Sequence, residues 1–364
     1  MGKWNHVAPV QYAEFLKTSR WPQLDGLRTV SIALVLVVHM GDPWWPPFKG
    51  ALAVVLFFVI SGYLITSLLI REERRNGRVS LKAFYLRRAF RILPLYFLAL
   101  TVSAVLVLGL GLGQGTDGFL TRLPLLATLN GDLAGGGVFV HSWSIGVEEK
   151  FYILWPLLGF TLLALRRHRG PLLLSLLVLV SAAAYIQPVS YLGTYTGIVA
   201  GCALATAMHT ERGFRVVSRL SGPVVGTALI GLAFVAFLTD PLMPMAEESG
   251  LAHVPFAIAA ALAFPAVVIG NGAVAHVLAH PWLVQLGWRA YGLYLFHPLC
   301  IDVIGRIVPA GQETAGLTLV RFVLAAALSL GVAEVLYRAV EQPAIGVGRR
   351  IARRYNRTEA VTTA

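Results

Sequence analysis

The sequence predicts an all-α membrane protein with about ten transmembrane helices. Of its 364 residues, 57% are hydrophobic and 13% are charged, and this charged fraction is about half that of a typical soluble domain. Ten apolar stretches approach the ~20 residues that a helix needs to cross the hydrocarbon core of a bilayer. The loops between these stretches alternate between basic and weakly charged, which is the positive-inside pattern of multi-pass proteins.

The ten apolar stretches divide the chain into three parts. We expect a cytoplasmic segment over 1–23, a membrane domain over 24–343 and a disordered basic cytoplasmic tail over 344–364, with no further domain after it. An even number of spans places both termini on the cytoplasmic side of the cell membrane. Residues 1–23 lack the apolar core of a signal peptide. The predicted spans are residues 24–42, 51–71, 84–108, 145–165, 171–188, 191–208, 222–239, 250–270, 282–304 and 317–340.

The net charge of +12 does not indicate nucleic-acid binding. Of the 30 Lys and Arg residues, 22 lie in five clusters at the predicted cytoplasmic ends of the spans. Such a distribution orients a membrane protein rather than forming a continuous basic surface. We therefore expect the lipid bilayer, and no nucleic acid, as a partner. We also expect no metal site.

The first span, LDGLRTVSIALVLVVHM over Leu24–Met40, carries two polar groups on one helical face. Arg28 and His39 are 11 positions apart, which brings them to within ~20° of each other around the helix and ~16 Å along it. Ionisable residues at bilayer depth usually face a cavity and serve function, so we predict that both line a water-filled pocket. The alternative is that Arg28 extends to the cytoplasmic interface and His39 lies at the outer boundary.

The most basic segment, from Arg71 to Arg91, ends in the sequence YLRRAFRILPLY. Arg88 and Arg91 are three residues apart and share a helical face with each other, and Arg87 is adjacent. Guanidinium groups bind phosphates in a bidentate manner, so these residues could hold a phosphate-bearing cytosolic ligand. Anchoring to lipid headgroups is the alternative.

The longest outer segment, residues 109–144, leads into a second polar stretch. It presents His141, Ser142 and Trp143, and Glu148 and Glu149 follow on the opening turns of the fourth span. Long loops in compact proteins are often functional. The carboxylates could instead complement the helix dipole.

Two further features have simple structural explanations. His297 lies in the ninth span at the level proposed for His39, but it precedes Pro298 and could mark a helix kink. Ser61 and Gly62, in the second span, are small residues that suit close helix packing.

Taken together, these blocks resemble the acyltransferase-3 family of integral membrane acyltransferases. The resemblance covers most of residues 24–343, and its blocks occur in the family's order. They are LDGLR with His39, FFVISGYL at 57–64, RRAFRILPLY at 87–96, HSWSIGVEEKFYILWP at 141–156, LGWRAYGLYLFHP at 286–298 and EQP at 341–343.

This resemblance implies a ten-helix core that transfers an acyl group, usually acetyl, from acyl-CoA, with no bound cofactor. The acceptor would be a hydroxyl of a sugar, an envelope glycan or a glycosylated natural product. By position, the catalytic residues would be Arg28, His39, Glu148 and Glu149. The substrate-binding residues would be Arg87, Arg88, Arg91, Ser142, Trp143, Tyr152 and His297.

Three positions depart from the family pattern. Ala53 to Leu56 contain no acid where relatives often have one, Lys150 stands where Gln is common, and Ala290 where Ser is common. These differences concern the acceptor more than the reaction.

We expect neutral His39 to take the proton of the acceptor hydroxyl as it attacks the thioester, with Glu149 orienting the imidazole. Direct transfer and a covalent acyl intermediate both stay open. One alternative is a proton-coupled small-molecule transporter that uses Arg28 and His39 as a relay, although no inverted repeat is present. Another is an acyl-CoA sensor without turnover.

Overall fold

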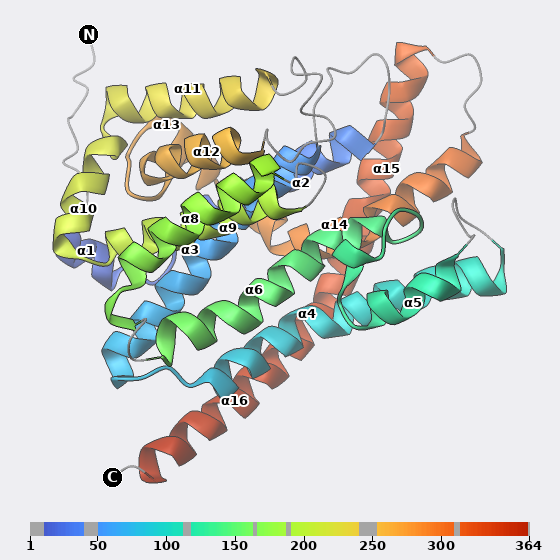
Figure 1. The fold of residues 1–364 in the computed structure, drawn as a ribbon. Coiled ribbons are helices and arrows are strands. Elements are labelled where there is room, and N and C mark those ends of the chain that lie inside the picture. Colours follow the sequence, from blue (N-terminus) through green and yellow to red (C-terminus); the bar gives the residue numbers. More distant parts are fainter. Residues whose placement is uncertain are drawn as a thin grey trace. The chain divides into compact units, whose positions relative to one another are not determined.

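The computed structural model describes residues 11–39, 50–111, 118–162, 166–186, 191–239, 253–308 and 314–362. Every regular element within these ranges is a helix, which confirms the all-α prediction (Figure 1). The chain divides into two compact units, each built from separate stretches of sequence. Each unit is described by itself below.

The first unit contains the described residues of Met1–Val38, Trp45–Glu72 and Arg167–Trp288. Its helices stack in sequence, with α8 against α9, α9 against α12, and α12 against α11 (Figure 1). Its elements are α1 (Tyr12–Lys17), α2 (Pro22–His39) up to residue 38, α3 (Gly50–Asn76) up to residue 72, α8 (Arg169–Ile186), α9 (Leu192–Met208), α10 (Glu211–Val217), η4 (Ser218–Ser221), α11 (Pro223–Thr239), α12 (His253–Val268), α13 (Ala273–Leu278) and the start of α14 (Pro281–Ile307).

Close contact between α3 and α9 depends on glycine. A Cβ atom on Gly62 would lie 2.0 Å from the carbonyl oxygen of Ile198, and one on Gly201 would lie 2.3 Å from that of Val59. Each helix therefore presents a glycine to the backbone of the other. This confirms the packing interpretation of Gly62 and explains a short part of the FFVISGYL block.

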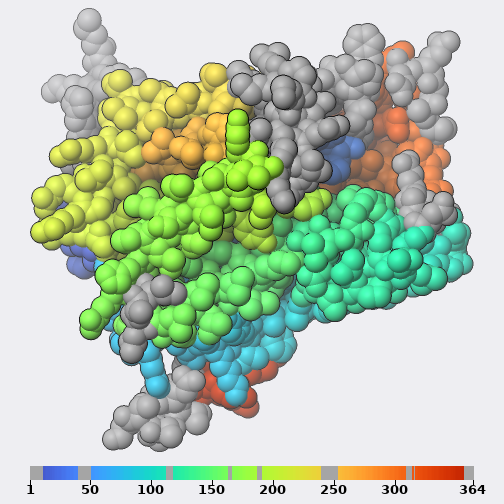
Figure 2. Space-filling view, viewed as in Figure 1, coloured from blue at the N-terminus to red at the C-terminus, as the bar shows by residue number. Residues whose placement is uncertain are grey.

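The surface of the first unit is strongly apolar on α8 and α11, which are visible in lime green and yellow in Figure 2. Exposed side chains include Leu174, Val178 and Leu179 on α8, and Val224 and Phe234 on α11. A soluble protein rarely exposes so many large apolar groups together. This surface is suited to acyl chains of lipid.

The second unit contains the described residues of His39–Trp44, Glu73–Arg166 and Arg289–Ala364. Gly77, in the left-handed conformation with φ 72°, reverses the chain between α3 and α4, and the Ser80 hydroxyl caps the start of α4 by accepting from the Ala83 amide. The elements are α4 (Leu81–Ala104), η1 (Val105–Gly109), α5 (Phe119–Ala127), η2 (Gly131–Leu133), η3 (Val140–Ser142), α6 (Trp143–Phe160), the remainder of α14, α15 (Ala315–Leu336), η8 (Tyr337–Glu341) and α16 (Gln342–Thr362).

The C-terminal tail corrects the expectation of disorder over 344–364. Residues 342–362 form helix α16, which packs along α4 (Figure 1). Gly348 and Ala352 are buried, a Cβ atom on Gly348 would meet Phe90 at 2.6 Å, and the Lys82 ammonium lies 3.8 Å from the ring centre of Tyr355. Small residues four apart thus give this basic segment a face that packs closely on another helix.

Each of the ten predicted spans coincides largely with a helix, but ten membrane crossings are not confirmed. Within the described residues, four helices are long and apolar enough to cross a membrane. A fifth crossing results if a pair bent by 78° counts as one span. Five predicted spans are not among these crossings, and two of them, α9 and α12, have only 17 and 16 residues. The four helices are Ala51–Asn76, Leu81–Gly109, Arg169–Ile186 and Gly316–Tyr355, and the bent pair is Glu211–Ser221 with Pro223–Leu238.

Candidate functional site

Asp25 organises the polar residues at the start of α2. Its carboxylate accepts hydrogen bonds from Arg28 Nη1 at 3.2 Å, Arg20 Nη2 at 2.8 Å and Trp288 Nε1 at 3.2 Å. The Arg20 guanidinium also stacks on the Trp288 ring, 4.8 Å from its centre. Asp25 was not among the predicted site residues, although its spacing of three from Arg28 places the two on one helical face.

Backbone contact between α2 and the later helices explains the glycines beside these charges. A Cβ atom on Gly26 would lie 1.9 Å from the Leu278 carbonyl oxygen, and one on Gly287 would lie 1.9 Å from that of Asp25. The Thr29 hydroxyl donates to the Leu283 carbonyl at 2.6 Å. The LDGLR and LGWR blocks therefore pack closely against each other, and this contact holds Asp25 near Trp288.

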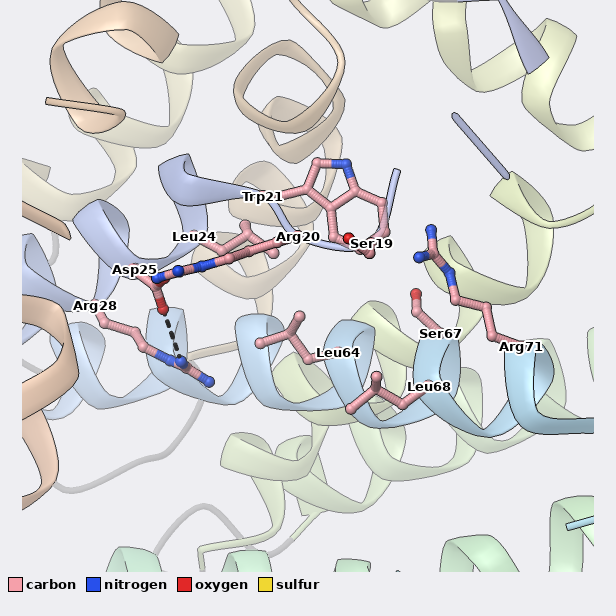
Figure 3. Close-up of a pocket in the computed structure, with 10 residues that line it drawn as sticks. All are labelled: Ser19, Arg20, Trp21, Leu24, Asp25, Arg28, Leu64, Ser67, Leu68 and Arg71. Carbon is pink, nitrogen blue, oxygen red and sulfur yellow. Dashed lines mark hydrogen bonds and ion pairs between the residues drawn. The ribbon is translucent and has the colours of Figure 1, made fainter. Parts of the chain in front are cut away.

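A cavity of about 130 Å³ lies beside Arg28 in the first unit. Figure 3 shows Arg28 and Arg71 at opposite ends of a row, with Leu64 and Leu68 of α3 between them. Arg71 stacks on Trp21, 4.4 Å from the ring centre, and also bonds to the Thr18 carbonyl. Three guanidinium groups and one carboxylate line this cavity, so its chemistry suits an anion with an apolar portion.

The second unit contains a cluster of three histidines. The rings of His39 and His297 are 4.7 Å apart between centres and nearly perpendicular, at 79°. The rings of His141 and His297 are 5.7 Å apart. His39 is exposed, whereas His141 and His297 are buried. The prediction that His297 lies at the level of His39 is therefore confirmed by direct ring contact.

Hydrogen bonds fix His141, one of the two buried histidines of this cluster. His141 Nε2 donates to the Leu295 carbonyl at 3.1 Å, because a carbonyl can only accept. The Tyr294 hydroxyl lies 2.6 Å from the His141 carbonyl and 2.7 Å from the Ser144 hydroxyl. Burial, followed by the neighbouring His39, lowers the pKa of His141 to about 3, so this ring stays neutral.

Strained backbone precedes His141. Phe139 has a φ of 67°, a conformation that is uncommon for a bulky residue and is often retained at functional sites. Its ring packs against those of His141 and Tyr96, at centre-to-centre distances of 4.9 and 5.4 Å. This conformation helps to orient His141, a residue for which the sequence predicted no role.

Five predicted site residues come together between α4 and α6. The Arg88 guanidinium stacks on Tyr152, 4.4 Å from its ring centre. The Tyr152 hydroxyl donates to Glu148 Oε1 at 3.0 Å. Arg88 interacts electrostatically with Arg91, Glu148 and Glu149. Glu149 Oε1 is buried and has no hydrogen-bond partner among the described residues.

Glu341, from the EQP block, belongs to the same polar region. It is buried, with 3% of its surface exposed, and lies in the π-helical turn η8. Tyr291 interacts electrostatically with both Glu149 and Glu341 and donates its hydroxyl to the Ile92 carbonyl at 2.9 Å. Turns of this kind inside α-helices are frequent at functional sites. The EQP block was part of the family resemblance, but Glu341 was not among the predicted site residues.

The other predicted positions have simpler surroundings. Lys150 Nζ lies 2.5 Å from the Asp132 carboxylate, so this departure from the family pattern ties α6 to the outer segment. Ser142 is buried against Gly131. Arg87 and Trp143 are half-buried. Among the described residues, no group of three or more His, Cys, Asp or Glu side chains is arranged to hold a metal ion.

Arg28 belongs to the first unit and His39 to the second. The prediction that both face a single pocket therefore stays a prediction. So does the role of Glu149 as the partner that orients His39.

Comparison with known proteins identifies the family. The acyltransferase 3 family model, described as an acyltransferase domain, matches residues 21–338, and the chain belongs to this family. No solved structure matches it.

Three curated proteins are similar to most of the chain. Peptidoglycan O-acetyltransferase OatA of Listeria monocytogenes is 27% identical over 88% of this chain and 55% of its own length. The putative peptidoglycan O-acetyltransferase YrhL of Bacillus subtilis is 28% identical over 88% of this chain and 54% of its own length. The putative O-acetyltransferase SAS0844 of Staphylococcus aureus is 25% identical over 91% and 58%. The chain spans a little over half the length of these relatives.

Proposed function

We propose that this protein is a membrane-bound O-acyltransferase that moves an acetyl group from acetyl-CoA to a hydroxyl of a sugar, an envelope glycan or a glycosylated natural product. Membership of the acyltransferase 3 family supports the reaction class. The names of the relatives favour a carbohydrate of the cell envelope as acceptor. The observation that carries the proposal is the exposed imidazole of His39, which stands against a buried histidine cluster.

In the proposed reaction, neutral His39 acts as general base. It removes the proton from the acceptor hydroxyl while the hydroxyl oxygen attacks the thioester carbonyl carbon. The carbon–sulfur bond breaks, the acetyl group stays on the oxygen, and the CoA thiolate takes up the proton from His39. A positioned base of this kind contributes about 10²–10⁴-fold to the rate.

The arginines are proposed to bind the donor. Arg88 and Arg91 share a face of α4, and Arg88 is already oriented by stacking on Tyr152. Guanidinium groups suit the phosphates of CoA because they form paired, charge-assisted hydrogen bonds. Arg28 is proposed to act in the same way beside its cavity, where Asp25 fixes its position.

Reconstitution in proteoliposomes tests the proposal. Acetyl-CoA and the N-acetylglucosamine–N-acetylmuramic acid disaccharide are supplied, and CoA release and the acetylated sugar are measured by mass spectrometry. We expect acceptor-dependent CoA release by the wild type and loss of at least about 10²-fold in His39→Ala, with expression unchanged. A fully active His39→Ala variant would contradict the mechanism. Proton-coupled solute uptake without cleavage of acetyl-CoA would instead identify a transporter.

A further inference from the structure

Pro298 determines which nitrogen of His297 carries a proton. In a regular helix, the amide of residue 298 would donate to the carbonyl of Tyr294, but proline has no amide hydrogen. His297 Nδ1 lies 2.8 Å from this carbonyl and 3.2 Å from that of Leu293. Because carbonyl oxygens only accept hydrogen bonds, Nδ1 is the protonated nitrogen. The lone pair of the neutral ring is therefore on Nε2.

That lone pair is held in the interior beside His39. His297 is fully buried, and its Nε2 has no hydrogen-bond partner among the described residues. An unsatisfied buried acceptor is costly and is uncommon unless it serves the site. The ring in contact with it on the exposed side is His39, at 4.7 Å between centres. The rings of His141 and Tyr294 also contact His297. Both already have hydrogen-bond partners, His141 Nε2 at the Leu295 carbonyl and the Tyr294 hydroxyl at the His141 carbonyl.

We propose that His297 is the positioning residue of His39: when the exposed His39 ring turns towards it, His297 Nε2 accepts a hydrogen bond from that ring and thereby fixes the tautomer of the base. The other nitrogen of His39 then keeps its lone pair for the acceptor hydroxyl. In serine hydrolases a buried carboxylate behind the histidine has this function. Here the Pro298–His297 pair provides a neutral acceptor instead, in place of the Glu149 carboxylate that the sequence predicted for this role. The inference rests on the proposed role of His39.

Two substitutions separate the lone pair from the volume of the ring. His297→Phe keeps an aromatic ring but has no acceptor, whereas His297→Gln places an amide oxygen near the position of Nε2. We expect His297→Phe to lower kcat by on the order of 10²-fold without a matching change in KM for acetyl-CoA. His297→Gln should recover most of that loss. Equal losses in both variants, or wild-type activity in His297→Phe, would overturn the proposal.

A third variant leaves the histidine in place. Pro298→Ala restores the backbone amide that competes with His297 Nδ1 for the Tyr294 carbonyl, so kcat should fall several-fold while the melting temperature is kept or raised. Pro265→Ala, in α12 of the first unit, is the matched control and should not lower kcat. Equal kcat in Pro298→Ala and wild type would contradict the role of the proline.

The double variant His39→Ala/His297→Phe distinguishes this inference from the proposed function. Because His297 acts through His39, the second substitution should cause no further loss once His39 is absent. If His39→Ala abolishes transfer but His297→Phe is fully active, the proposed function stands and the positioning role fails. If the wild type does not transfer acetyl groups, the proposed function itself fails.

Discussion

Arg28 and His39 lie on the same helix, yet the side chains around them are of different kinds. Around Arg28, the carboxylate of Asp25 accepts hydrogen bonds from three donors, and glycine contacts hold the neighbouring backbone. Around His39 are the imidazole rings of His297, in direct contact, and of His141, which contacts His297. One of them, His297, keeps a nitrogen atom without a partner among the described residues.

This difference separates two uses of buried polar groups. A hydrogen-bonded network such as that of Asp25 fixes the geometry of the side chains at the start of α2. A buried acceptor such as Glu149 Oε1 or His297 Nε2 gains no such stabilisation. We infer that the first unit uses its polar residues mainly to position Arg28, and that the second unit holds the groups that change their hydrogen bonds during reaction.

The largest expected effect tests the buried polar groups of the second unit. Glu149→Gln should lower kcat by on the order of 10²-fold, because Glu149 is a predicted catalytic residue whose buried carboxylate interacts with Arg88, the proposed donor-binding arginine. The melting temperature in detergent should not fall, since a neutral amide is easier to bury than a carboxylate. Glu211→Gln, which changes an exposed glutamate on α10, is the control. Full activity of Glu149→Gln would remove this residue from the site.

The next effect concerns the backbone contact that holds the start of α2, near Arg28. Gly26→Ala places a Cβ atom 1.9 Å from a backbone carbonyl, so the contact between α2 and the Leu278 backbone must open. We expect destabilisation of about 1–3 kcal/mol, measured by thermal unfolding in detergent. Gly231→Ala has nothing within 4 Å of its new Cβ and should stabilise α11 by up to about 1 kcal/mol. Equal melting temperatures of the two variants would show that the close contact is dispensable.

The last effect is a dependence of stability on pH. The pKa of His141 is lowered to about 3 by burial, whereas in the unfolded chain a histidine titrates near 6.5. The unfolded state therefore binds the proton first, and stability falls by about 1.4 kcal/mol per pH unit as the pH drops from ~6.5 towards ~3. His141→Gln keeps a donor to the Leu295 carbonyl but does not titrate.

Thermal unfolding at pH 7.5 and pH 5 measures this difference. His141→Gln should lose less of its melting temperature than the wild type between the two values. Identical losses would show that His141 does not contribute to the acid sensitivity of the fold.

The helices and several site residues could be predicted because they depend on local sequence. Apolar length locates the helices, and a spacing of three or four residues places Arg88 beside Arg91 and Glu148 beside Tyr152. The order of the sequence blocks was sufficient to predict the family. The number of crossings could not be predicted in this way, because an apolar run also describes a short helix buried among others, such as α9.

The missed features depend on contacts between distant segments. Glu341 joins the polar region only because η8 brings it into the interaction range of Tyr291. The sequence predicted only a shared level for His39 and His297, and their direct ring contact joins residues that are far apart in the sequence. Helix α16 was missed because its seam is made of Gly348 and Ala352 within a basic segment, and mean hydropathy does not register a narrow face of small residues.

The packing of α16 on α4 has a consequence for where this protein can be shortened. The family match ends at residue 338, inside the turn Tyr337–Glu341 and before the last helix. A boundary drawn there would delete Glu341 and uncover Phe90, which Gly348 touches. Truncation experiments should therefore keep the chain through at least Tyr355, because this C-terminal segment completes the helix pair that carries the arginines.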